Sequence, residues 1–269
     1  MKFNHTAADE EEYKNHTVFK DLKTMGEFYK SFSFSIIGFA TTGTRSVINI
    51  DTYIFSSIEG TLESILLILE KGRIGDAYSL LRKFHDSITL NLYTNLFLDE
   101  NRGKNDNFLV EEVTAWLNNT KKLPHNTYGK MSEYLEGSNR LKAIFDLLNV
   151  ENSYIETRQR CNDHTHYNFF DNVLINDNKV HAPRRISLLA IFRQDLINLF
   201  ILHIACVFTL NDHYMMSSDY VDYLDVGLDP EPDSQYWVAS FIKEAFSGIV
   251  EVNRPDIAKF IKSNTLMHL

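Results

Sequence analysis

The residues best suited to chemistry lie in one stretch, Glu156 to Phe170, which reads ETRQRCNDHTHYNFF. It places Arg158, Arg160, His164 and His166 within nine positions. A guanidinium binds a phosphate through a fixed fork of N–H donors, and an imidazole transfers protons near neutral pH. Together these groups could cleave RNA without a metal, because a base would activate the 2′-hydroxyl while an arginine stabilises the charge on the phosphorane.

The spacing of these residues leaves their pairing open. Arg160 and His166 form an R-x5-H pattern, and Arg158 and His164 form the same pattern two positions earlier. A structural interpretation competes with both, since histidine and arginine commonly cap the last carbonyl groups of a helix. Spacing alone therefore does not choose between a catalytic pair and a helix terminus.

The helices that must position this stretch can be predicted from apolar periodicity. From Asp51, the residues Ile54, Ile58, Leu62, Ile65 and Leu69 recur at steps of three and four, and Lys71-Gly72 supplies a stop. A second helix begins at about Gly75, and the short connection predicts an antiparallel helical hairpin. One more helix is expected over Glu151–Asn162, with Arg158 and Arg160 in its final turns.

Two residues of the second helix, Arg82 and Asp86, lie four positions apart beside its apolar stripe. They could form an ion pair on the flank of their own helix. Alternatively, Arg82, His85 or Asp86 faces the stretch from Arg160 to His166 inside the bundle.

The longest helix is predicted at about Arg185–Asn211, opened by Pro183. Its apolar run, Leu196 to Leu210, is shorter than the roughly 20 residues that span a membrane. Extending the run backwards meets Asp195, Gln194 and Arg193, and both Asn198 and His203 lie within it. We interpret it as a buried core helix and predict no membrane association.

Shorter elements complete an all-α fold, a helical bundle. We expect an amphipathic helix within residues 8–30, short helices near Val110–Leu117, Tyr128–Leu135 and Arg140–Leu148, and C-terminal helices near Trp237–Val250 and Pro255–Lys262. A small β-hairpin is predicted around Asn176-Asp177-Asn178, between Val173-Leu174 and Val180. The predicted organisation is an N-terminal extension over 1–50 packed on the core, a helical bundle over 51–215 and a helical extension over 216–269.

Composition limits the class of protein. The chain has 269 residues, a formal net charge of −9 and a pI near 5.6, which argues against broad binding to a nucleic-acid backbone but permits a local basic site. Cys161 and Cys206 form no CxxC motif, so neither a disulfide framework nor a thiolate zinc site is expected. The N-terminus lacks the apolar segment of a signal peptide, and a cytoplasmic location is predicted.

The segments LLRKFHD and RCNDHTHYN together resemble the HEPN superfamily, especially abortive-infection-like members with an R…ND..H.N pattern. The resemblance implies a helical bundle and a metal-independent ribonuclease with an R-x4-6-H motif, active as a homodimer with paired motifs. It also implies RNA as substrate, a role in antiphage defence or a toxin system, and an antitoxin or defence-system partner. No cofactor is expected.

The resemblance assigns roles to individual residues. Arg160 corresponds to the motif arginine, which would bind phosphate, and His166 to the motif histidine, which would be the acid/base. The supporting catalytic residues would be His164, Asp163 and Asn162, and substrate would be bound by Arg158, Arg82 and Asn168.

Two other interpretations remain. The chain could be a catalytically inactive binding or scaffold module in which the same residues form a buried polar network. It could also be a metal-dependent helical-bundle enzyme, with ligands drawn from His85, Asp86, Asp163, His164, His166, His203, Asp212 and His213.

Overall fold

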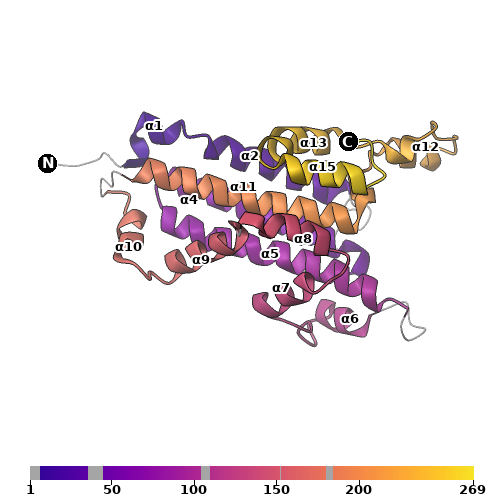
Figure 1. The fold of residues 1–269 in the computed structure, drawn as a ribbon, viewed down its shortest axis with the longest axis horizontal. Coiled ribbons are helices and arrows are strands. Elements are labelled where there is room, and N and C mark those ends of the chain that lie inside the picture. The colour runs from indigo at the N-terminus through magenta and orange to yellow at the C-terminus, as the bar shows by residue number, and fades with distance from the viewer. Residues whose placement is uncertain (1–6, 36–44, 104–109, 152, 180–183) are drawn as a thin grey trace.

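The computed structural model describes residues 7–35, 45–103, 110–151, 153–179 and 184–269. Within these ranges the chain is all-α and contains no β-sheet, which confirms the predicted fold class (Figure 1). Residues from all three predicted segments contribute to one hydrophobic core.

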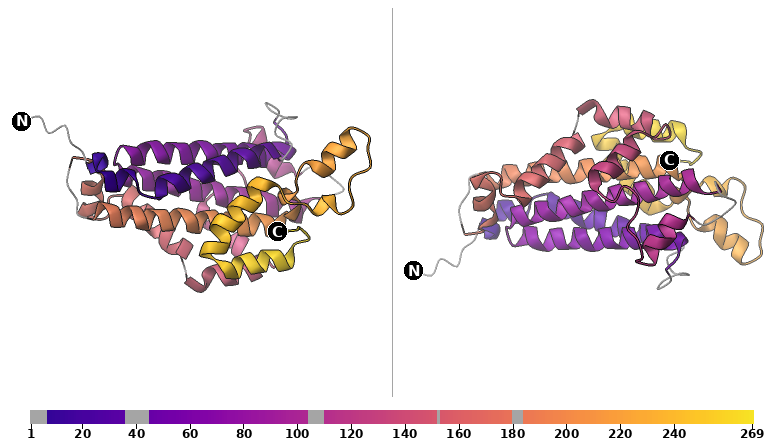
Figure 2. Two further views of the ribbon diagram at one scale, coloured as in Figure 1. Left: turned by 90° about the horizontal axis from the view of Figure 1, so that it is seen from above. Right: turned by 90° about the horizontal axis from the view of Figure 1, so that it is seen from below.

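Four long helices form the centre of the molecule: α2 (Val18–Ser33), α4 (Ile50–Glu70), α5 (Ile74–Asn101) and α11 (Arg185–Leu210). Helix α2 packs against α4, α4 against α5, α5 against α11, and α11 against α2. The four helices therefore close around a shared core, and they run alongside one another in Figures 1 and 2.

The connection between α4 and α5 forms as the sequence predicts. The apolar stripe from Ile54 to Leu69 is buried, and Gly72 adopts a left-handed conformation with φ of 75°. The N–H of Gly72 donates to the carbonyl of Leu69 at 2.8 Å, and the N–H of Arg73 donates to the carbonyl of Ile68 at 3.2 Å. These two bonds define a Schellman motif, which ends α4 and allows α5 to return antiparallel to it.

Helix α11 is the core helix that its apolar run predicts, because nearly every side chain from Leu196 to Leu210 is buried. Among the described residues, Val47–Glu70 and Arg185–Leu210 are long and apolar enough to cross a membrane by length and composition alone. In the bundle, 39% and 78% of their respective most apolar windows are buried inside the protein.

A chain of buried polar groups crosses the centre of the bundle. The Asn91 amide donates to Asp51 at 2.7 Å, while its oxygen lies 2.9 Å from Nε2 of His203. The other ring nitrogen of His203 lies 2.7 Å from the hydroxyl of Tyr29. Complete burial lowers the pKa of His203 to about 3, so the ring is neutral at pH 7. His203 is thus a hydrogen-bonded core histidine.

A second layer lies on this core. Helix α9 (Ser153–Thr165) packs against α5 and α11, α10 (Phe170–Asn176) against α5 and α9, and α7 (Tyr128–Glu136) against α5. Helix α12 (Asp219–Asp225) projects beyond the end of the bundle opposite the N-terminus (Figures 1 and 2). The remaining elements are η1 (Ala7–Asp9), α1 (Glu11–Lys14), η3 (Val47–Asn49), α6 (Glu111–Leu117), α8 (Lys142–Leu148), η4 (Asn149–Glu151), η5 (Asp212–Met215), α12 (Asp219–Asp225), η6 (Ser234–Tyr236), α13 (Ser240–Ala245), η7 (Phe246–Val250), α14 (Glu251–Asn253) and α15 (Pro255–Asn264).

The predicted β-hairpin is wrong, because its first arm belongs to helix α10. Residues Asn172, Ile175 and Asn176 lie on one face of this helix, and each is held by the rest of the protein. Ile175 is buried, Asn172 donates to the carbonyl of Asp163, and Asn176 exchanges two hydrogen bonds with Asp76 at the start of α5. Tertiary contacts at helical spacing therefore override the local strand pattern. Val180 and Pro183 lie outside the described residues.

Candidate functional site

The candidate residues lie on α9 and on the turn that follows it, as expected for a helix end. The N–H of Tyr167 donates to the carbonyl of His164 at 3.3 Å, and that of Asn168 donates to the carbonyl of Asp163 at 3.0 Å. This is a second Schellman motif, with Tyr167 in the left-handed position at φ of 51°. His166 is consequently the first residue beyond the helix, on an exposed turn.

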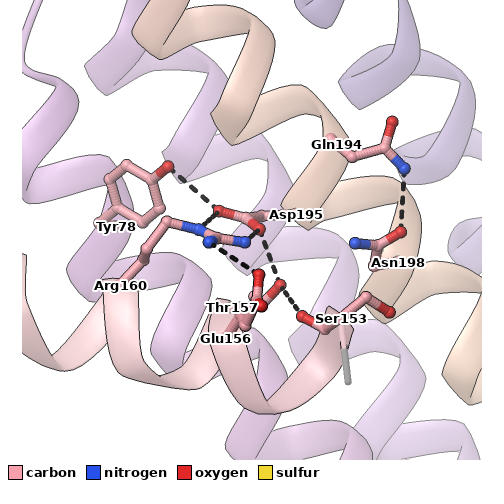
Figure 3. Close-up of polar contacts among 8 residues, drawn as sticks. All are labelled: Tyr78, Ser153, Glu156, Thr157, Arg160, Gln194, Asp195 and Asn198. Carbon is pink, nitrogen blue, oxygen red and sulfur yellow. Dashed lines mark hydrogen bonds and ion pairs between the residues drawn. The ribbon is translucent and has the colours of Figure 1, made fainter. Parts of the chain in front are cut away.

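The face of α9 toward α11 is occupied by an ion pair between Arg160 and the buried Asp195. Arg160 donates through Nε to Oδ2 at 2.9 Å and through Nη2 to Oδ1 at 2.5 Å. Thr157 donates to Oδ1 at 2.7 Å and Tyr78 to Oδ2 at 3.1 Å (Figure 3). The Asp195 side chain has no exposed surface, so these four hydrogen bonds replace its hydration.

Arg160, the predicted phosphate ligand, is therefore already bound to a carboxylate through two of its nitrogens, Nε and Nη2. Hydrogen bonding to Asp195 raises the pKa of Arg160 further above its ordinary value, and Nη1 lies 3.5 Å from Glu156. A charge buried as completely as that of Asp195 requires such a partner. In this structure Arg160 stabilises the packing of α9 on α11.

His164 lies on the same buried face. Its ring stacks on that of Tyr78, with centroids 4.2 Å apart and an interplanar angle of 6°. Burial lowers the pKa of His164 to about 4, although the nearby Asp163 and Asp195 carboxylates act in the opposite direction. The ring is neutral at pH 7, and its Nδ1 has no hydrogen-bond partner among the described residues.

The opposite edge of α9 brings two other candidates together at the surface. Nη1 of Arg82 on α5 lies 3.2 Å from Nε2 of His166. A guanidinium can only donate, so Nε2 of His166 is the acceptor in this contact. Arg82 is partly exposed and His166 is exposed. An arginine and an imidazole thus meet at a solvent-exposed turn.

Arg158 extends this surface toward α7. It donates to Asp86 of α5 at 2.6 Å, and its guanidinium lies 3.8 Å from the centroid of the Tyr128 ring. Arg82 and Asp86 therefore both face the α9 region, as the second of the two sequence interpretations predicts. Arg158 and Tyr128 also line a groove of about 610 Å³ between α7 and α9.

Beneath Tyr128 lies a buried histidine. The hydroxyl of Tyr128 lies 3.2 Å from Nε2 of His85, which is 1% exposed. Burial, with a further contribution from the positive charge of Arg158, lowers the pKa of His85 to about 3. Since the neutral ring is covered by α7, we assign it to packing rather than to proton transfer.

The remaining polar candidates organise the turn that carries His166. Oδ1 of Asp163 accepts from Asn168 at 2.8 Å and from Gln159 at 3.0 Å. The backbone carbonyl of Asn162 accepts the N–H of His166 at 3.0 Å. Ser79 and Thr165 lie 3.2 Å apart and link α5 to the last turn of α9. These residues hold the imidazole beside Arg82.

Sequence reasoning did not identify two residues of this cluster. Asp195 binds Arg160, and Tyr78 stacks on His164. Asp195 interrupts an apolar helix, and a charge in that position must be paired when it is buried. That signal was visible, but it does not identify the partner. Tyr78 has no such signal, because a tyrosine on an amphipathic helix is ordinary.

The potential metal ligands do not converge. Among the residues that the structure describes, no three His, Cys, Asp or Glu side chains are grouped so that they could hold a metal ion. Comparisons of this chain with protein-family models, with curated proteins and with solved structures give no match.

Proposed function

We propose that this chain is a metal-independent endoribonuclease of HEPN type. His166 acts as the acid/base, and Arg82 takes the phosphate-binding role that the family pattern gives to Arg160. The observation that carries the proposal is the 3.2 Å contact between the exposed His166 and Arg82. The HEPN resemblance of the two segments that contribute these residues supports the same assignment.

The chemistry requires one base and one cation at the same phosphodiester. Nε2 of His166 takes the proton of a ribose 2′-hydroxyl, and the 2′-oxygen bonds to the adjacent phosphorus. The bond from phosphorus to the 5′-oxygen breaks, and that oxygen takes a proton from the imidazolium or from water. Arg82 leaves Nε2 and binds the non-bridging phosphate oxygens, whose charge grows as the phosphorane forms. The products are a 2′,3′-cyclic phosphate and a 5′-hydroxyl.

A second candidate function is a catalytically inactive binding or scaffold module. The pairing of Arg160 with the buried Asp195 favours it, because the motif arginine then serves stability alone. In that case the exposed pair of Arg82 and His166 would be a binding surface without chemistry.

Cleavage of a mixed RNA pool in the presence of a chelator tests the proposal. Wild-type protein should cleave, His166→Ala should lose cleavage, and His213→Ala, which removes another exposed histidine, should retain it. End-group analysis should find the cyclic phosphate. Cleavage that requires an added metal would favour a metal-dependent enzyme. Absence of cleavage by the wild type, even at high protein concentration, would favour the binding module.

A further inference from the structure

Three aromatic side chains directly follow His166 and project into solvent. Tyr167 is 49% exposed, Phe169 is 61% exposed and Phe170 is 73% exposed. Scattered exposed apolar residues are ordinary, but three exposed rings within four positions of one turn are not scattered, and we call them the aromatic patch. The patch lies at the outer end of α9, where α10 begins.

The backbone of Tyr167 gives an independent reason to assign a role to its ring. Tyr167 and Gly72 occupy the same position in the two Schellman motifs, with φ of 51° and 75°. The left-handed conformation is unfavourable for a residue with a Cβ atom, a cost that glycine avoids. The half-exposed ring of Tyr167 gains little burial in return. A non-glycine residue held in this conformation beside a candidate acid/base points to a function for its side chain.

The aromatic patch and the acid/base are fixed to one another. Tyr167 adjoins His166, and the bonds from Asn168 and Asn172 to Asp163 hold the turn between α9 and α10. The three rings are therefore carried on the same ordered turn as the acid/base.

The charges beside the patch suit a phosphate backbone. Arg82 lies beside His166, and Arg184 is 81% exposed, with its Nη1 4.0 Å from Asp171. Cations that follow a backbone, combined with rings on which bases stack, are the means by which proteins bind single-stranded nucleic acid. A duplex hides the faces of its bases, so it cannot use the rings in this way.

We infer that the substrate is unpaired RNA, with successive bases stacked on Tyr167, Phe169 and Phe170 while the phosphodiester lies at Arg82 and His166. This inference rests on the proposed function, because it names the substrate class of the same site. The rival occupant of the rings is a second copy of this chain.

The test measures binding of a short, labelled, mixed-sequence RNA, single-stranded or annealed to its complement, to the full chain carrying His166→Ala to prevent cleavage. Adding Phe169→Ala and Phe170→Ala should weaken single-strand binding roughly tenfold for each ring. Tyr167→Gly should weaken binding comparably while raising the midpoint of thermal unfolding. Phe34→Ala removes a ring that is 60% exposed elsewhere and should change neither property. Duplex RNA should bind more weakly and should not respond to the ring variants.

The outcomes separate this inference from the proposed function. Two results would overturn the inference but keep the proposed nuclease function, provided that the wild type cleaves RNA. One is equal binding of single-stranded and duplex RNA. The other is that the ring variants bind RNA as tightly as His166→Ala alone. If nothing is cleaved but single strands bind through the rings, the inference survives as a binding face. Absence of any RNA binding would overturn it, as would ring variants that dissociate a dimer, by analytical ultracentrifugation, without weakening RNA binding.

Discussion

The two sides of helix α9 carry similar residues in different surroundings. Toward α11, Arg160 and His164 are bound to Asp195 and Tyr78, which are buried. Toward solvent and α5, Arg82 meets His166 at an open position. Both sides contain an arginine and a histidine from the predicted site, but Arg160 is bound to a buried carboxylate and His164 is itself buried, whereas Arg82 meets a histidine that is exposed. Bonding partners and the exposure of the histidine, rather than motif spacing, therefore distinguish the pair that can meet a substrate.

The largest effect is expected from Arg160→Met. Without the guanidinium, the Asp195 carboxylate stays buried with only two hydroxyl donors, so the free energy of unfolding should fall by about 3–5 kcal/mol. Urea denaturation measures this loss. The double variant Arg160→Met/Asp195→Asn removes the stranded charge and should recover part of the stability. Equal stability of both variants would mean that the ion pair does not anchor α9.

A smaller effect is expected from the pH dependence of His164. Its folded pKa of about 4 lies below the ordinary value of 6.5, so its contribution to stability is full above pH 6.5 and is lost as the pH falls toward 4. His164→Phe keeps a ring against Tyr78 but cannot be protonated. Between pH 7 and pH 5 this variant should lose roughly 2 kcal/mol less stability than the wild type. Identical pH profiles would contradict the buried, neutral state of the ring.

Thr157→Val tests the face of α9 toward α11 with a smaller perturbation. It removes one of four hydrogen bonds to Asp195 while nearly preserving the shape of the side chain. Because three donors remain, we expect a loss of about 1–2 kcal/mol, measured by thermal or urea unfolding. A loss as large as that of Arg160→Met would show that the hydroxyl, and not the ion pair, dominates the cluster.

The smallest effect on stability is expected on the exposed side. His166→Ala and Arg82→Ala should each change the free energy of unfolding by no more than about 0.5 kcal/mol, since neither side chain is part of the core. The same variants should lose RNA cleavage. A large loss of stability in either variant would mean that Arg82 or His166 also stabilises the fold, as Arg160 does.

Much of the fold follows from local pattern. The stripe from Ile54 to Leu69, the stop at Gly72 and the apolar run of α11 each depend on residues within one helix, and each is confirmed. The failure at α10 has the opposite cause, because Asn172 and Asn176 are held by Asp163 and Asp76. Contacts of this kind cannot be read from a window of neighbouring residues.

The candidate site could be located but not resolved from the sequence. The stretch from Glu156 to Phe170 does end a helix, and Arg82 does face it. The partner of Arg160, however, is Asp195, 35 positions away on a different helix. A motif fixes residue types along the chain, whereas the packing of α9 between α5 and α11 decides which side chain is buried.

The two arginines are separated by one measurement: chelator-resistant RNA cleavage by Arg160→Met/Asp195→Asn and by Arg82→Ala, at a temperature where both are folded. We expect the first variant to retain cleavage, because Arg160 serves stability, and the second to lose it. Loss of cleavage in the Arg160 variant, with full activity in Arg82→Ala, would instead assign the phosphate-binding role to Arg160.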